Sequence, residues 1–342
     1  MNNRKTRRQT PPATLRIGGI AAVPAALADF GIDARETLAA AGIDPDLLDD
    51  PNNMITYAAR NRLFKICVAE TGCQHFGLLV GQRMNLQSFG LLGLLMRNMP
   101  DAGAALRALV TYLHIHTQGA ITTLQVAYDL ATLRYDVTQP MAGATDQIGD
   151  GAVAVMLNSM RTLCGPGFQA IEASFAHHKP ADIKPFKKFF RTPLHFDAAH
   201  SGLVFSRKWL NVRVPGADGE LRHQLQQQID AIKANHGAEL PEQVRNVLRS
   251  ALLTGHYSEE QIAALFGMTS RTLIRRLQSF DTGFRELVDE CRHDLARQML
   301  ENSSLTIGEV ADALGYTRAS AFIRAFRRWT GTTPGLWRAQ QS

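Results

Sequence analysis

The sequence predicts a mixed α/β N-terminal domain followed by an all-α C-terminal domain with two helix-turn-helix units. Two observations carry this prediction. The C-terminal part contains the same residue pattern twice, and residues 17–215 combine helical periodicity with stretches that alternate as strands do. At 342 residues the chain is long enough for two domains that each bury a core.

The C-terminal repeat begins each time with a capped short helix. Its first copy starts at Ser258 and its second at Thr306, 48 residues later. In each copy a glutamine or glutamate follows three positions on, at Gln261 and Glu309, which is the pattern of a capping box. A duplicated capping box indicates a duplicated structural unit.

A sharp turn and a second helix complete each copy. Gly267 and Gly315 stand at the turn, where a positive φ favours glycine. We expect the second helices to run from about residue 269 to 280 and from about residue 318 to 329. Their core-facing residues are Leu273 and Leu277 in the first helix and Phe322 and Phe326 in the second. This arrangement predicts two helix-turn-helix units.

The outer side of each second helix supplies candidate DNA contacts. Arginine suits this role because its planar fork bonds guanine O6 and N7 or grips phosphate. Arg275 and Arg324 occupy equivalent places in the two copies and are the strongest candidates. Ile274 and Ile323, also equivalent, either touch thymine methyl groups or extend the core. The predicted DNA-binding set is Thr269, Ser270, Arg271, Thr272, Ile274, Arg275, Arg276, Thr317, Arg318, Ala319, Ser320, Ile323, Arg324 and Arg327.

Two further helices complete the predicted C-terminal domain. One opens at Leu240-Pro241. Another has one apolar face marked from Phe284 to Met299, with roughly seventeen residues spanning about 25 Å. The second helix separates the two units by a distance that suits successive major-groove segments on one face of DNA. One chain can therefore read two half-sites. The other arginines are expected to be solvated helix residues: Arg285, Arg292, Arg297 and Arg338.

Residues 240–340 resemble the AraC/XylS-type DNA-binding domain. The resemblance is carried by Ala311-x-x-Leu314-Gly315-Tyr316 and by Ser320-x-Phe322-x-Arg324-x-Phe326-Arg327-Arg328-Trp329-x-Gly331-x-x-Pro334. The sequence departs from the family pattern in three places. Asp281 stands where glycine commonly ends the first recognition helix, Ala319 replaces a common proline, and Arg318 stands where the family often has an acid.

The N-terminal part shows helices interrupted by strands. The helices are predicted at 33–48, 55–70, 88–99, 102–116 and 145–163. The strands are predicted within 121–136, with a turn at 128–131, and at 170–175, 194–196 and 202–205. This alternation predicts the mixed α/β class.

This part resembles the ligand-binding domain of the OruR/VirS-like branch of the AraC family. The motifs are His75-Phe76-Gly77-Leu78, Phe89-Gly90-Leu91-Leu92-Gly93 and Phe175-Ala176-His177-x-x-Pro180-Ala181-Asp182. Phe189-Phe190, Pro193-x-x-Phe196 and Leu203-Val204-Phe205 follow them. The resemblance implies an AraC-type arabinose-binding-like module that senses an effector and forms dimers, and it does not name the effector.

Few residues of this module stand out as ligand contacts. The weak candidates for the effector site are Tyr112, His116, Asp146 and Gln147. No histidine lies in a local H-x3-H or similar metal-binding spacing, so neither a metal nor another cofactor is expected. No nucleophile elbow, glycine-rich phosphate loop or paired-carboxylate motif occurs, and we therefore expect no enzyme activity.

The charges and cysteines indicate where the protein acts. The formal net charge is +6, and residues 1–16 are expected to form a flexible basic tail. Residues 11–238 are nearly neutral, which suits a module that does not touch nucleic acid. The four cysteines lack C-x-x-C spacing, which indicates reduced thiols and a cytoplasmic location. No apolar run is long enough to span a membrane, so no membrane partner is expected.

The domain plan has four parts: a tail at 1–16, an effector-binding and dimerisation domain at 17–215, a linker helix at 216–239, and a DNA-binding domain at 240–342. In the linker, Leu221, Leu225, Ile229 and Ile232 form a narrow apolar stripe. We expect this helix to dock on the sensing domain or on its dimer mate, and so to couple the two halves.

The sequence thus favours a one-component bacterial transcription regulator. Its expected partners are double-stranded promoter DNA, a small-molecule effector, RNA polymerase and a second copy of the chain. Two alternatives stay open. One is a DNA-modifying or repair enzyme fused to an AraC-like DNA reader, which would need cysteine partners that Cys67 and Cys73 lack. The other is an architectural DNA protein, against which the neutral domain of about 200 residues argues.

Overall fold

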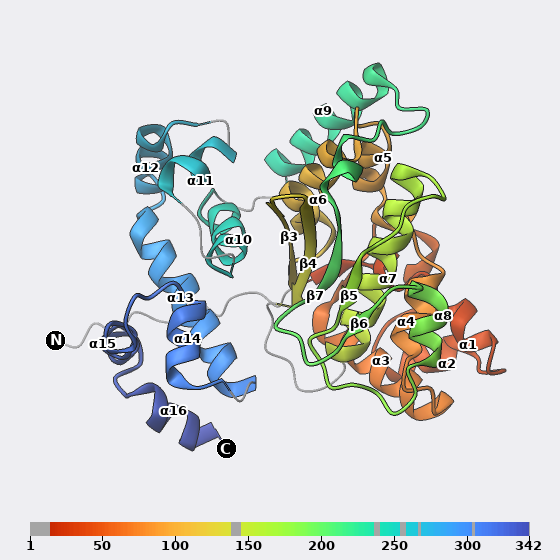
Figure 1. The fold of residues 1–342 in the computed structure, drawn as a ribbon, viewed down its shortest axis with the longest axis horizontal. Coiled ribbons are helices and arrows are strands. Elements are labelled where there is room, and N and C mark those ends of the chain that lie inside the picture. The colour runs from red at the N-terminus through yellow and green to blue at the C-terminus, as the bar shows by residue number, and fades with distance from the viewer. Residues whose placement is uncertain are drawn as a thin grey trace.

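The protein has a mixed α/β N-terminal half and an all-helical C-terminal half (Figure 1). This confirms the predicted fold class. The computed structural model describes residues 14–137, 145–235, 240–253, 258–265, 268–302 and 305–341. Within these ranges no helix is long and apolar enough to cross a membrane.

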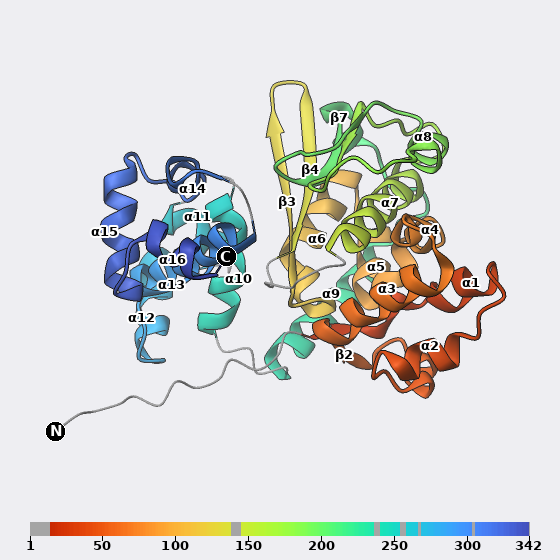
Figure 2. The same cartoon turned by 90° about the horizontal axis from the view of Figure 1, so that it is seen from below.

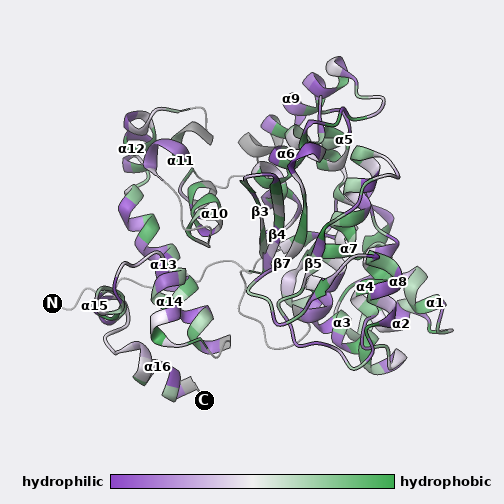
Figure 3. Ribbon diagram, in the orientation of Figure 1, coloured by the Kyte–Doolittle hydropathy of each residue, from purple (hydrophilic) through white to green (hydrophobic). Residues whose placement is uncertain are grey.

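A five-stranded sheet lies at the centre of the N-terminal half. Its order is β3-β4-β7-β5-β6, with β5 and β6 parallel and the other neighbours antiparallel. The strands are β3 (Ala120–Ala127), β4 (Leu130–Val137), β5 (Glu172–Ser174), β6 (Leu194–His195) and β7 (Ser201–Ser206). Figure 3 shows hydrophobic residues along β3 and β4. The hairpin predicted within 121–136 is confirmed, with its turn at Tyr128 and Asp129.

Two long helices cover this sheet and form the first core with it. Helices α6 (Ala102–His116) and α7 (Thr145–Cys164) bury an apolar stripe against β4 and β7. Both match their predictions within one residue at each end. Smaller elements surround this core: the 3-10 helices at Leu86–Phe89 and Arg207–Asn211, α5 (Leu91–Arg97) and α8 (Lys184–Phe190).

A second core lies at the N-terminal end of the chain. It is formed by β1 (Thr14–Arg16), α1 (Val23–Ala28), α2 (Ala34–Ala40), β2 (Met54–Thr56), α3 (Tyr57–Thr71), α4 (Phe76–Gln82) and the 3-10 helices at Ile17–Ile20 and Pro45–Asp49. Strand β1 pairs antiparallel with β2, and Leu15 is fully buried. The prediction of a flexible tail through residue 16 is therefore wrong for residues 14–16, while residues 1–13 lie outside the described ranges.

The helix predicted at 33–48 is also corrected. It ends at Ala40, and the chain then turns at Gly42, whose φ is +74°. A 3-10 helix follows from Pro45, with Asp44 as its N-cap. Asp44 accepts a hydrogen bond from the backbone of Asp46, which stabilises a new helix start and interrupts the apparent periodicity.

The predicted linker helix is α9 (Gly219–Asn235), and it docks on the N-terminal half. Leu225 and Ile229 are buried against Leu95 of α5 and Ala108 of α6. Gln226 also donates a hydrogen bond to the Tyr112 hydroxyl, 2.8 Å away. Two residues of the predicted stripe, Leu225 and Ile229, thus form a docking face on the same chain, whereas Leu221 is exposed.

Seven helices of the described residues form the C-terminal half around a single core: α10 (Leu240–Leu253), α11 (Glu259–Leu265), α12 (Ser270–Gln278), α13 (Phe284–Asn302), α14 (Ile307–Ala313), α15 (Ala319–Thr330) and α16 (Pro334–Gln341). Helix α13 joins the two units and is 19 residues, or about 28 Å, long. Helix α10 faces the edge strand β3 in both views (Figures 1 and 2). Gln298 of α13 donates to the Val137 carbonyl at the end of β4, across 2.8 Å.

Candidate DNA interface and effector cavity

Helices α12 and α15 present one apolar face and one exposed face each. Leu273 and Leu277 of α12 are fully buried, as are Phe322 and Phe326 of α15, which confirms the predicted orientation. The opposite face of α12 exposes Arg271, Arg275 and Arg276; on α15 and at its N-cap, Arg318, Ser320, Ile323, Arg324 and Arg327 are exposed. Both helices lie on the side of the C-terminal half that is turned away from the sheet (Figures 1 and 2).

Six exposed arginines on α12, on α15 and at its N-cap have no acidic partner in the described part of the chain. Among the described residues, no ion pair involves Arg271, Arg275, Arg276, Arg318, Arg324 or Arg327. Other arginines of the same half do pair: Arg245 with Glu290, Arg249 with Asp294, and Arg328, which is also exposed on α15, with Asp289. The positive charge of the two outer faces is therefore available to an external anion.

Local hydrogen bonds fix the starts of the helices as the sequence predicts. Ser258 and Gln261 exchange backbone and side-chain hydrogen bonds, and Thr306 and Glu309 form the second capping box. Thr269 caps α12 by accepting from the backbone of Thr272. As the N-cap, Thr269 stabilises the start of the helix. The DNA contacts expected of Thr269, Ser270, Thr272, Thr317 and Ala319 stay predictions.

Two residues in the left-handed region shape the turns. Gly315 has a φ of +75°, as predicted for the turn before the second recognition helix, whereas Gly267 lies outside the described residues. Asp281, which replaces a common glycine of the family, has a φ of +55°. An aspartate tolerates this conformation better than most residues but at a cost, so the departure preserves the helix end.

Three arginines predicted to be solvated are packed instead. The guanidinium of Arg292 lies 4.8 Å from the ring centre of Tyr316, and that of Arg297 lies 5.0 Å from that of Trp337. Arg338 donates to the carbonyls of Leu300 and Leu305. Arg292 and Arg297 connect helices by stacking on aromatic rings, and Arg338 does so by bonding backbone carbonyls. Their long stems can cover apolar surface at the same time.

A cavity of about 90 Å³ lies in the N-terminal half where its two cores meet. On the scale at which one water needs about 10–15 Å³, this is room for a small organic molecule. The walls come from α3, α4, α6, α7, β1, β3, β4 and the 3-10 helices at Ile17–Ile20 and Leu86–Phe89. They are mainly apolar, with Phe64, Met84, Leu109, Leu113, Val155 and Met156 among them. Such a site, apolar with few polar groups, is typical of ligand pockets.

The four weak ligand candidates lie in different places. His116, at the end of α6, lines the cavity and is 8% exposed. Gln147 also lines it, but its side-chain amide is used to bond the backbone of Gly77 and Gln74. Tyr112 is bound to the docked helix α9, and Asp146 is exposed. Neither belongs to the cavity wall, and their roles in binding stay predictions.

Sequence reasoning missed Arg60, which also lines the cavity. A signal was present, because Arg60 is three residues after Tyr57 and four before Phe64, on one face of α3. Both of these neighbours are buried. An arginine on the buried face of a helix marks a candidate site, since arginine keeps its charge when buried.

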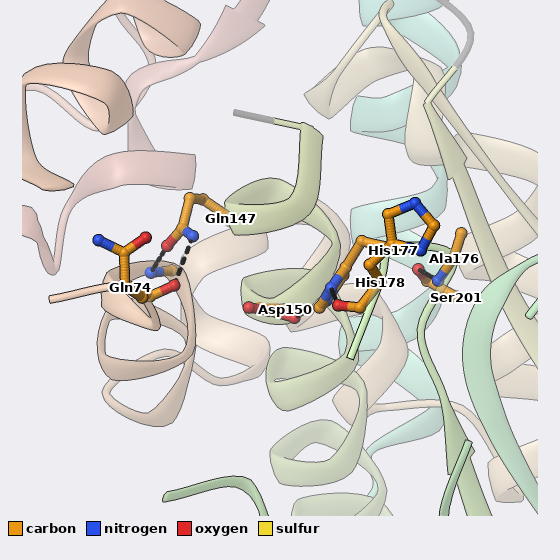
Figure 4. Close-up of polar contacts among 8 residues, drawn as sticks. Gln74, Gln147, Asp150, Ala176, His177, His178 and Ser201 are labelled. Carbon is orange, nitrogen blue, oxygen red and sulfur yellow. Dashed lines mark hydrogen bonds and ion pairs between the residues drawn. The ribbon is translucent and has the colours of Figure 1, made fainter. Parts of the chain in front are cut away.

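Polar contacts clamp the start of α7 between neighbouring elements (Figure 4). Asp150 is buried and lies 2.7 Å from Nε2 of His177. Burial acts to lower the pKa of His177, but the hydrogen bond and charge of Asp150 outweigh it and raise the pKa. Ser201 accepts from the backbone of Ala176. The Asp150–His177 contact and the Gln147 amide both hold the start of α7, whose Ile148 and Gly151 line the cavity.

The chain has two helix-turn-helix units, whose second helices expose arginines without an ion-pair partner among the described residues, and a ligand-sized cavity in the other half. These features define a ligand-responsive DNA-binding transcription regulator. The family comparison agrees. Residues 31–214 match the model of the arabinose-binding domain of AraC transcription regulators, N-terminal, and residues 262–340 match a helix-turn-helix domain model. The chain belongs to the AraC family of transcription regulators.

Relatives are similar over nearly the whole chain. The ornithine utilization regulator of Pseudomonas aeruginosa is 27% identical over 317 residues, which cover 91% of this chain and 92% of the relative. The regulator VirS of Mycobacterium tuberculosis is 26% identical over 313 residues, with coverage of 91% and 92%. The crystal structure of the regulator CdpR of P. aeruginosa is 22% identical, covers 89% of this chain and 96% of that one, and has a TM-score of 0.44.

Proposed function

We propose that the chain is a one-component bacterial transcription regulator that reads two half-sites in promoter DNA, one through α12 and one through α15. The observation that carries this proposal is the equivalent placement of Arg275 and Arg324, which are exposed and form no ion pair within the described residues. As an AraC-family regulator it acts in the cytoplasm as a homodimer and contacts RNA polymerase at the promoter.

In this proposal the protein has no catalytic activity. A cysteine-based enzyme needs a thiolate, but burial raises the pKa of Cys67 to about 12 and that of Cys164 to about 11. Burial likewise raises the pKa of Cys73, and that of Cys291 to about 12. The thiols are thus protonated and unreactive at neutral pH, which disfavours the alternative of a DNA-repair enzyme.

Effector control has two physical routes from the cavity to the DNA-binding half. Tyr135 lines the cavity, and two residues further on β4 the Val137 carbonyl accepts from Gln298 of α13. On the other side, α6 contributes Leu109 to the cavity and Ala108 to the docking face of α9. A ligand shifts the regulator only if it binds one arrangement of these contacts better than another.

DNA binding by arginine variants tests the proposal. DNA fragments bound in the cell are identified by genomic footprinting, and their affinity for the full chain is then measured by fluorescence anisotropy. Arg275→Ala and Arg324→Ala should each weaken binding by about 1–3 kcal/mol, or roughly 5- to 150-fold. The control Arg285→Ala, exposed on α13, should bind as the wild type does. Wild-type affinity in both test variants would refute the proposal.

A further inference from the structure

Arg60 is a buried charge without a counter-charge. It is 6% exposed, and its Nε and Nη2 atoms have no hydrogen-bond partner among the described residues. No carboxylate of the described residues lies within 4.0 Å of its guanidinium. The segment 138–144, which joins β4 to α7 and lies outside the described residues, contains no acidic residue.

The protein itself only partly compensates this charge. The guanidinium carbon of Arg60 lies 3.8 Å from the ring centre of Tyr57, a cation–π contact. Burial acts to lower the pKa of Arg60, but Tyr57 and Tyr135 outweigh it, so the pKa is raised and the group stays charged. A buried charge without a hydrogen-bonded partner carries a large free-energy cost. An anion in the cavity would remove that cost.

The rest of the cavity wall suits the body of such an anion. Within the described ranges no acidic residue lines it, and apolar side chains predominate. His116, Thr117 and Thr122 add neutral polar groups. Burial, and then the charges of Arg16 and Arg60, lower the pKa of His116 to about 3, so the imidazole is neutral at physiological pH. Nδ1 of His116 and Oγ1 of Thr117 are buried and have no hydrogen-bond partner in the part of the chain that the structure describes.

We infer that this cavity is the effector site and that the effector is a small monocarboxylate with an apolar body, whose carboxylate pairs with Arg60. The planar fork of arginine matches the two oxygens of a carboxylate. A cationic amine would meet Arg60 without any counter-charge in the wall. The inference rests on the proposed function, in that it assigns the chemistry of the regulator's effector.

Panels of ligands added to the whole chain test which polar head group the cavity prefers. Thermal unfolding is followed with monocarboxylates such as hexanoate and phenylacetate, each beside the amide and the amine of the same carbon skeleton. A carboxylate of the panel should raise the melting temperature by roughly 5–10 °C at a hundred times its dissociation constant. Its amide should give a much smaller shift and its amine none. Equal shifts for the neutral or cationic ligands, or no shift for any carboxylate, would overturn the inference.

Arg60→Met removes the charge and keeps an unbranched stem. It should abolish the carboxylate shift without lowering the melting temperature of the ligand-free protein, because no buried charge remains. Arg62→Met, on the exposed side of the same helix, is the control and should keep the shift. An undiminished shift in Arg60→Met would overturn the inference. The ligand comparison in the wild type decides the question even if this variant does not fold.

DNA binding separates this inference from the proposed function. If the chain binds its promoter fragments but shows no preference for carboxylates, the inference is wrong and the proposed function stands. If the arginine variants of α12 and α15 bind those fragments like the wild type, the proposed function is wrong, whatever the cavity holds.

Discussion

Replacing His116 by glutamine should remove a pH dependence from the stability of the sensing half. The folded protein holds the pKa of His116 at about 3, mainly through burial, whereas an unfolded histidine has a pKa of about 6.5. Below that value the unfolded chain takes up a proton that the folded protein refuses. The free energy of unfolding therefore decreases as the pH falls from about 6.5 towards 3. Near pH 5 the loss is about 2 kcal/mol, at about 1.4 kcal/mol per pH unit.

Urea unfolding near pH 7.5 and near pH 5 measures this loss. Trp209 lies in the sensing half, and its fluorescence reports on that half when Trp329 and Trp337 are replaced by phenylalanine in every protein compared. Between the two pH values, His116→Gln should lose about 2 kcal/mol less stability than the wild type. His223→Gln, an exposed histidine on α9, should behave as the wild type does. The same pH dependence in His116→Gln and wild type would refute the reasoning.

Three further predictions concern the coupling helix, the DNA-binding half and one turn. Replacing Leu225 and Ile229 together by serine should leave effector affinity nearly intact and uncouple it from transcription; a wild-type dose response in a reporter assay would show that α9 is only a linker. The fragment 238–342 should fold alone, by circular dichroism, and bind DNA weakly with an affinity that falls steeply with salt; an unfolded fragment would contradict the domain boundary. Asp281→Gly should stabilise that half by up to about 1 kcal/mol in urea, because glycine adopts the φ of +55° without strain, and a loss of stability would count against strain there.

Local patterns predicted most of the C-terminal half from sequence. The capping boxes at Ser258 and Thr306 depend on residues three positions apart, and the buried faces of α12 and α15 depend on residues one turn apart. Such signals need no knowledge of the tertiary fold. The same holds for α6, whose bounds match the prediction because its apolar stripe is long and uninterrupted.

Contacts between distant segments limited the prediction of the other half. The strand at Thr14–Arg16 exists because it pairs with Met54–Thr56, which a local pattern does not reveal. The isolation of Arg60 is likewise a tertiary property, because Tyr135 and His116 come to it from β4 and α6. The spacing of Tyr57, Arg60 and Phe64 along the helix is visible in the sequence, but only the packing shows that no described acidic residue pairs with Arg60.

The central claim is that one chain reads two half-sites, and selection of bound sequences from a random DNA library tests it most directly. The full chain should select a bipartite site whose halves are centred about one helical turn, or roughly 10 base pairs, apart. Repeating the selection with Arg275→Ala should relax the preference in one half, and with Arg324→Ala in the other. A single undivided site, or relaxation of the same positions by both variants, would contradict the account.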